Sequence, residues 1–65
     1  MYISQRTLRR MLKDAGAGRV GEDAAKEFQV YANKTIFEIA QRAVSLSKHA
    51  KRKTVYGSDV ELSFK

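Results

Sequence analysis

The sequence lacks several kinds of residue on which small proteins often depend. It has no cysteine, so disulfides are excluded, and its single histidine leaves no credible zinc cluster. No run of 18 apolar residues is present, which excludes a membrane-spanning helix, and residues 1–6 lack the apolar run of a signal peptide. A lone chain of this size buries only about 60% of its unfolded surface. Association with another chain is the remaining means of support, and a cytoplasmic protein is expected.

Acidic residues are outnumbered by basic ones. The chain has 13 Lys and Arg against 7 Asp and Glu, a formal net charge of +6, and a pI near 10.0. This balance predicts an anionic partner, most often nucleic acid, with a membrane surface as the alternative. There is no nucleophile–base pair, glycine-rich phosphate loop or carboxylate dyad, and Ser45, His49 and Asp59 have no accompanying oxyanion loop. We therefore expect no enzyme activity, cofactor, metal site or small-molecule substrate.

Apolar spacing and capping residues predict a short basic helix from Ser4 to Ala15. Ser4 is a favourable N-cap residue, and Gly16 or Gly18 supplies the C-terminal stop. The apolar residues follow the helical repeat i, i+3, i+4, i+7 and are Leu8, Met11, Leu12 and Ala15.

The segment from Glu22 to Ala50 contains neither proline nor glycine and predicts one long helix. Its length of about 43 Å exceeds the diameter of roughly 28 Å expected for a compact chain of this size. One apolar group on this helix consists of Phe28, Tyr31, Ala32, Thr35, Ile36, Ile39, Ala43, Leu46 and Ala50. A second group, nearly opposite, consists of Val30, Phe37, Ala40 and Val44. We expect one group to contact the chain's own short helices and the other a partner's long helix.

Two loops flank the long segment. In the first loop, Val20 is expected to point inward and Arg19 outward. The second loop contains a short β-prone run, Thr54–Tyr56. The turn and N-cap signal at Gly57–Asp59 then predicts a last short helix from Asp59 to Lys65.

The order short helix, loop, long helix, β-prone loop, short helix closely resembles the archaeal histones. The matching stretches are Lys13–Ala17, Arg19–Val20, Leu46, His49–Ala50, Arg52–Thr54 and Asp59–Leu62. The resemblance covers nearly the whole chain and implies an all-α histone fold, with residues 1–65 as a single domain. In this fold two chains form an intertwined head-to-tail handshake dimer whose long helices cross near the middle. Each first loop then lies beside the partner's second loop, where Val20 and Val55 pair as short parallel strands.

The resemblance also implies a set of DNA-binding residues. Arg19 is expected to enter the minor groove, whose narrow form has a strong negative potential; a solvated loop arginine is the alternative. Arg10 and Lys13 share one face of the first helix and are expected to contact phosphates. Lys53 and Thr54 in the second loop offer a charge and a hydroxyl to phosphate oxygens.

Other positions are expected to hold the fold or depart from the family pattern. The resemblance pairs Arg52 with Asp59 as a structural loop contact, with a phosphate contact for Arg52 as the alternative. Gly21 replaces the usual serine-type cap of the long helix. Lys51 stands where glycine is common, so a different C-cap is expected, and Tyr56 replaces a common basic residue.

A dimer–dimer contact is also implied by the resemblance. It takes the form of a four-helix bundle made by Leu46, His49, Asp59 and Leu62. The alternative for His49 is a cap on its own helix. Gly16 matches a position where wrapped turns stack closely, and it is equally a helix C-cap. The third helix is clipped at Lys65, which weakens the expected bundle.

These features together predict an architectural DNA-binding protein, a histone. It is expected to form a homodimer, bind and bend or wrap double-stranded DNA, and polymerise into higher oligomers that compact the chromosome in the nucleoid. The alternatives are a histone-fold transcription-factor subunit that acts as a heterodimer, and a small basic RNA-binding protein.

Overall fold

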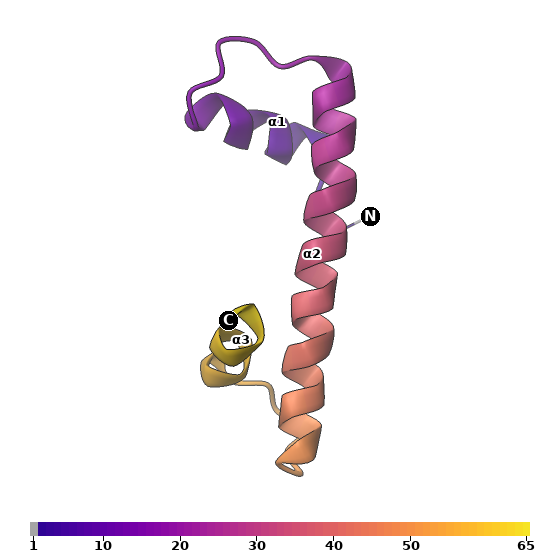
Figure 1. The fold of residues 1–65 in the computed structure, drawn as a ribbon, viewed down its shortest axis with the longest axis vertical. Coiled ribbons are helices and arrows are strands. Elements are labelled where there is room, and N and C mark those ends of the chain that lie inside the picture. The colour runs from indigo at the N-terminus through magenta and orange to yellow at the C-terminus, as the bar shows by residue number, and fades with distance from the viewer. Residues whose placement is uncertain (1) are drawn as a thin grey trace. The chain divides into compact units, whose positions relative to one another are not determined.

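The computed structural model describes residues 2–65, which form three α-helices and no strand (Figure 1). The helices are α1 (Gln5–Asp14), α2 (Glu22–His49) and α3 (Gly57–Phe64). The predicted short–long–short order is confirmed. Contacts divide the chain into two compact units, Met1–Lys34 and Thr35–Lys65.

Helix α1 begins and ends close to the predicted positions. The N–H of Thr7 donates to the side-chain oxygen of Ser4 at 3.2 Å, which confirms Ser4 as the N-cap. Gly16 supplies the stop, because it adopts a φ of +117° that side chains with a Cβ rarely reach. The N–H of Ala17 donates to the carbonyl of Leu12 at 3.0 Å and closes the helix end.

Helix α2 ends in a way that differs from the expectation. Lys51 adopts the left-handed conformation, with a φ of 59°, that glycine usually takes after a helix. The N–H of Arg52 then donates to the carbonyl of Ser47 at 2.9 Å. The expectation of a different C-cap is therefore wrong: the usual geometry is kept, at a backbone cost of about 1–2 kcal/mol for a residue with a Cβ.

Helix α3 begins two residues earlier than the sequence predicted. Asp59 is not its N-cap but lies in the first turn, where one carboxylate oxygen accepts the N–H of Tyr56 at 2.9 Å. The carboxylate thus provides a hydrogen-bond acceptor for the N–H of Tyr56, the residue before the helix. The helix can therefore begin at Gly57 and include Ser58. The run Thr54–Tyr56 forms no strand within the single chain.

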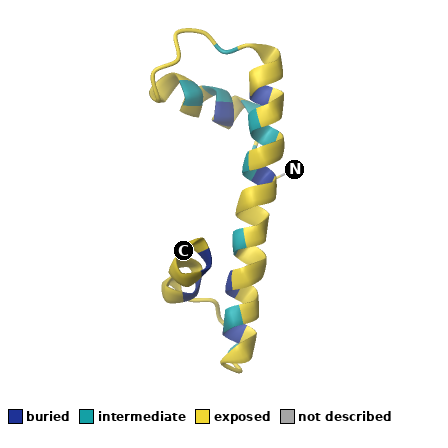
Figure 2. Ribbon diagram, viewed as in Figure 1, coloured by how far each residue is buried: buried dark blue, intermediate teal, exposed yellow. Residues whose placement is uncertain are grey.

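In the first unit, α1 packs against the N-terminal part of α2. Leu8 and Ala25 are buried there, at 1% and 0% exposure (Figure 2). The side chain of Gln5 also donates to that of Gln29 at 3.1 Å. The small core of this unit therefore combines one large aliphatic side chain with polar contacts along its edge.

Asn33 fastens the N-terminal segment to α2. Its side-chain oxygen accepts the N–H groups of Tyr2 and Ile3 at 2.9 and 2.7 Å. Its side-chain nitrogen donates to the carbonyls of Ile3 and Gln29 at 3.2 and 2.7 Å. Asn33 is only 8% exposed. These bonds occupy both N–H donors and both acceptor positions of its side-chain amide.

In the second unit, α3 packs against the C-terminal part of α2 through small and polar residues. Ala43 and Ser47 of α2 are buried, as are Asp59 and Ser63 of α3. The side chain of Arg42 donates to the carbonyl of Ser63 at 3.2 Å. Little apolar surface is removed from water by this contact.

Most large apolar side chains of the described chain remain exposed. They are Tyr2, Met11, Val30, Tyr31, Ile36, Phe37, Val44, Val55, Tyr56, Val60, Leu62 and Phe64. Of the first apolar group on α2, Ala43 is buried and Phe28 and Leu46 are half-buried, whereas Tyr31 and Ile36 near the middle of the helix are exposed. So much exposed apolar surface is typical of a chain that associates with a partner.

Candidate nucleic-acid interface

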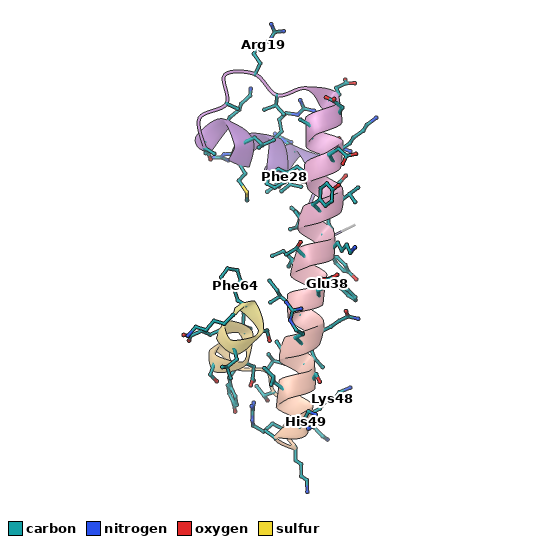
Figure 3. All side chains as sticks on the ribbon, viewed as in Figure 1. Arg19, Phe28, Glu38, Lys48, His49 and Phe64 are labelled. Carbon is teal, nitrogen blue, oxygen red and sulfur yellow. The ribbon has the colours of Figure 1, made fainter. Side chains whose placement is uncertain are left out.

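Arg19 lies in loop 1 (residues 15–21), between α1 and α2. Its side chain is exposed and extends away from the helices, whereas Val20 is half-buried, as the sequence predicted (Figure 3). Arg9 of α1 donates from Nη1 to the carbonyl of Val20 at 3.2 Å. The loop is thus held to the helix on one side of Arg19. The sequence alone did not predict this contact of Arg9.

Two further predicted DNA-binding residues lie in the same unit as Arg19. Arg10 and Lys13 are both exposed on α1. Within residues 2–65, neither they nor Arg19 is within ion-pair distance of a carboxylate. Their charges are therefore not neutralised inside the described chain, and an external anion can bind them.

Loop 2 (residues 50–56) contains the predicted pair. The Nη2 atom of Arg52 lies 2.9 Å from Oδ1 of Asp59, and Nη1 lies 3.1 Å from Oδ2. Nη1 also donates to the carbonyl of Thr54 at 2.9 Å, and the guanidinium lies 5.0 Å from the ring centre of Tyr56. Arg52 therefore braces loop 2 against α3, while Lys53 and Thr54 remain exposed.

The same contacts set the protonation of the pair. The hydrogen bond from Arg52, and after it the bond from the Tyr56 N–H, holds the pKa of Asp59 below its usual range. The bond to Asp59 also raises the pKa of Arg52. A depressed carboxyl pKa means that the ionised form stabilises the folded state.

Stability should therefore decline in acid partly through Asp59. The contribution of this carboxylate is present above its unfolded pKa, near 4, and is lost as pH falls through the lower folded value. An Asp59→Asn protein is expected to be less stable than wild type at pH 7, and the difference should shrink as the pH is lowered toward 2. Thermal unfolding followed at several pH values measures this.

Asp14→Asn is a matched control for this experiment, because Asp14 is an exposed carboxylate with no ion pair in the described chain. Asp14→Asn removes one negative charge, as Asp59→Asn does, but it leaves the Arg52–Asp59 ion pair intact. A constant difference between wild type and Asp59→Asn across the whole pH range would contradict the assignment.

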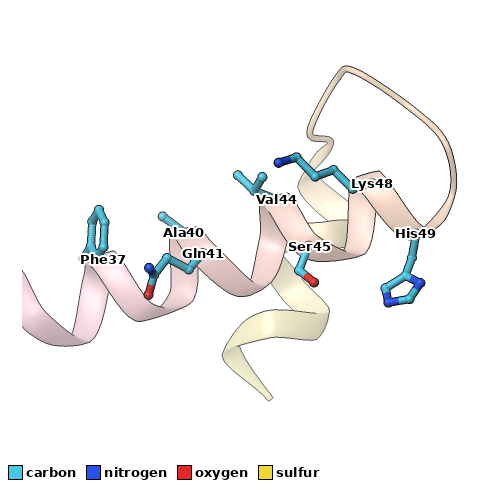
Figure 4. Close-up of a pocket in the computed structure, with 7 residues that line it drawn as sticks. All are labelled: Phe37, Ala40, Gln41, Val44, Ser45, Lys48 and His49. Atoms are coloured by element: carbon cyan, nitrogen blue, oxygen red, sulfur yellow. The ribbon is translucent and has the colours of Figure 1, made fainter.

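The residues predicted for a dimer–dimer contact all lie in the second unit. His49 and Leu62 are exposed, and Leu46 is half-buried. His49 also lies at one end of an open groove on α2 (Figure 4). The groove is lined by Phe37, Ala40, Gln41, Val44, Ser45, Lys48 and His49. Asp59, in contrast, is only 4% exposed, and its carboxylate already accepts from Arg52 and Tyr56.

Gly16 is explained within the chain by its backbone conformation. A Cβ at this position would meet no atom within 4 Å, so packing does not require glycine, but the φ of +117° does. Within the single chain, Gly16 therefore acts as the C-terminal cap of α1, which is one of the two roles predicted for it. Stacking of DNA turns at Gly16 stays a prediction.

A long central helix with a basic loop at each end, preceded and followed by a short helix, is the element order of the histone-fold class of DNA-binding proteins. The sequence profile of the family described as "histone-like transcription factor (CBF/NF-Y) and archaeal histone" matches residues 1–64. The chain belongs to this family, and the resemblance predicted from its sequence is confirmed.

Two relatives show how close the similarity is. The chain is 43% identical over 56 residues to one of the subunits of the archaeal histone HAN1 from Thermococcus zilligii. It is 48% identical over 56 residues to probable archaeal histone 3 of Methanocaldococcus jannaschii. Each alignment covers 86% of this chain and 84% of the relative.

Family membership establishes the general activity. The protein is an architectural DNA-binding protein with a histone fold that dimerises, and the expectation that it is not an enzyme is confirmed. The RNA-binding alternative has no support from these comparisons. In the described part of the chain, no helix is both long and apolar enough to cross a membrane.

Proposed function

We propose that this protein is a homodimeric chromosomal histone that binds duplex DNA through phosphates and the minor groove and bends it. The observation that carries the proposal is Arg19, an exposed arginine on a loop that is held to α1 and leads into the long helix. The family relationship supports an association with the chromosome, and we place the protein in the nucleoid.

The proposed dimer is the head-to-tail handshake. Among the described residues, only Leu8, Ala25 and Ala43 are buried apolar side chains, which is too little core for a chain that folds alone. We infer that the first apolar group makes both contacts that the sequence assigned to separate groups. Ala43 of this group is buried within the single chain, whereas a partner's α2 crossing near Ile36 would cover the exposed Tyr31 and Ile36. Antiparallel crossing then brings loop 1 of one chain beside loop 2 of the other.

Two basic loops side by side form the proposed DNA contact. Arg19 enters the minor groove where it faces the protein, and Lys53 and Thr54 bind the neighbouring phosphates. Arg10 and Lys13 add phosphate contacts from α1. Because these contacts read no base edges, sequence preference arises from how easily the DNA bends.

Replacing Arg19 with alanine tests this function. Affinity for duplex DNA is expected to fall on the order of tenfold at every sequence tested, because a charged, well-placed donor is lost from each chain. Binding should also weaken steeply with salt, by about 0.9 log unit per log unit of salt for each phosphate neutralised. Titrations with fluorescent duplexes at several salt concentrations measure both quantities.

Lys34→Ala is the control for the loss of one exposed charge on α2. It is expected to change affinity much less than Arg19→Ala does. Equal affinities for Arg19→Ala and wild type would refute the minor-groove role, and a flat salt response would refute the electrostatic account as a whole.

We further propose that dimers polymerise along DNA through Leu46, His49 and Leu62. His49 would hydrogen-bond Oδ1 of Asp59 in the next dimer, which accepts only one bond, from Arg52. Asp59 is 4% exposed, so loop 2 must shift for the imidazole to reach it. The exposure of Leu62, at 63%, supports an apolar contact there. Successive dimers would wrap DNA into a superhelix.

Nuclease digestion of DNA saturated with protein tests polymerisation. A ladder of regularly increasing fragments is expected for wild type, and a single short fragment for Leu46→Glu or His49→Asp. Gln41→Glu, which adds a charge outside the contact residues, should keep the ladder. A ladder that persists in the Leu46→Glu and His49→Asp proteins would show that the contact lies elsewhere.

One alternative is favoured by specific observations. The family description includes transcription factors, and the name of the Thermococcus relative designates one subunit. A heterodimeric protein of this kind would need a second, different histone-fold chain. It is distinguished from the homodimer by whether this chain dimerises when purified alone.

A further inference from the structure

Loop 1 presents Arg19 on a backbone that has very few attachments. Residues 18–20 make one hydrogen bond in the described chain, the bond from Arg9 to the Val20 carbonyl. We propose that Arg9 is a positioning residue that orders loop 1 and so directs Arg19 toward DNA. This inference rests on the proposed minor-groove role of Arg19.

The anchor starts from a firmly held element. Leu8, the neighbour of Arg9 in α1, is the largest fully buried side chain of the described residues, so the helix at this point is fixed against α2. The side chain of Arg9 is half-buried and spans from α1 to Val20 with a bond of 3.2 Å. Because Val20 directly follows Arg19, the bond restrains the backbone on the C-terminal side of Arg19.

The glycine-rich composition of loop 1 raises the entropic cost of ordering it. Gly16, Gly18 and Gly21 surround Arg19, and glycine loses more conformational freedom on ordering than any other residue. An unanchored loop would have to be ordered when DNA binds, which would reduce affinity. An anchor already present in the free protein avoids this loss.

The chemistry of arginine suits the anchoring role. Its guanidinium has five N–H donors in a rigid fork and carries a positive charge. One of these donors binds the Val20 carbonyl. This bond also brings the positive charge of Arg9 close to Arg19, where it adds to the basic surface. A charge effect and a positioning effect must therefore be separated by experiment.

Arg6 provides the matched control. It lies on the same helix and is exposed, and its side chain makes no hydrogen bond or ion pair in the part of the chain that the structure describes. Arg6→Met and Arg9→Met each remove one positive charge and one trypsin site from α1. Only Arg9→Met removes the anchor of loop 1.

The first measurement needs no DNA. Trypsin cleavage of the Arg19–Val20 bond, followed by mass spectrometry on the folded dimer, reports how often loop 1 opens. Arg9→Met is expected to be cleaved about tenfold faster at this bond than Arg6→Met. Thermal unfolding of both variants verifies that they are folded at the digestion temperature. Equal cleavage rates would overturn the proposal.

The second measurement couples Arg9 to Arg19 through DNA affinity. Arg9→Met is expected to bind about tenfold more weakly than Arg6→Met. When both are introduced into an Arg19→Ala protein, they should bind equally, because the anchor then has nothing to position. An Arg9 effect of the same size with and without Arg19 would overturn the proposal and identify Arg9 as a direct phosphate contact.

The two results separate this inference from the proposed function. If Arg19→Ala alone leaves affinity unchanged, the minor-groove function fails, whatever the trypsin result. If Arg19→Ala weakens binding but Arg9→Met behaves as Arg6→Met does in both measurements, the function stands and the positioning role of Arg9 fails.

Discussion

Replacing Ile36 with glutamate is expected to abolish the dimer and most of its helical structure. Ile36 is 53% exposed in the single chain although it is aliphatic, and it lies at the midpoint of α2, Glu22–His49. In a symmetric dimer that crosses there, each substitution counts twice. Losing two buried isoleucines and burying two carboxylates should weaken association on the order of a thousandfold or more.

The measurement is the dissociation constant of the dimer from sedimentation, together with circular dichroism at the same protein concentrations. Gln41→Glu is the control, since it places the same charge on the polar side of α2 and is expected to leave the dimer intact. If Ile36→Glu dimerises as tightly as Gln41→Glu, then α2 does not cross its partner at Ile36.

The second large effect is expected from Asn33→Ala. This change removes the acceptor for the N–H groups of Tyr2 and Ile3 and the donor to the carbonyl of Ile3, at a site that is 8% exposed. The free energy of unfolding should fall by about 2–4 kcal/mol per chain. Each lost hydrogen bond contributes about 1 kcal/mol, and the backbone groups that Asn33 bound are left without a hydrogen-bond partner. Urea unfolding at a fixed protein concentration measures the change.

Lys34→Ala serves as the neighbouring control, because Lys34 is exposed and adjacent to Asn33 on the same helix. Its effect is expected to stay within about 0.5 kcal/mol. A destabilisation no larger for Asn33→Ala than for Lys34→Ala would show that the N-terminal segment does not depend on this amide.

The helices were predictable because their signals are local. Ser4 and Gly16 mark the ends of α1 through capping and a positive φ, and the unbroken segment from Glu22 predicts α2 without any tertiary information. The pairing of Arg52 with Asp59 came from the family resemblance. It is a short-range contact across loop 2, and the structure contains it.

The features that the sequence did not predict depend on tertiary contacts. Asn33 in the middle of a helix is indistinguishable from a solvated polar residue until the N-terminal segment lies against it. Arg9 is one of several basic residues on α1, and nothing in its spacing indicates that it reaches Val20. The start of α3 was misplaced because Asp59 binds the backbone before it from within the first turn.

We propose that this chain pairs with a second copy of itself and that its folding depends on the pair. Native mass spectrometry of the chain purified on its own tests it most directly. We expect a folded species of twice the 7.4 kDa chain mass. A folded species of 7.4 kDa would contradict the need for a partner, and an unfolded chain that folds only with a different histone-fold protein would contradict the homodimer.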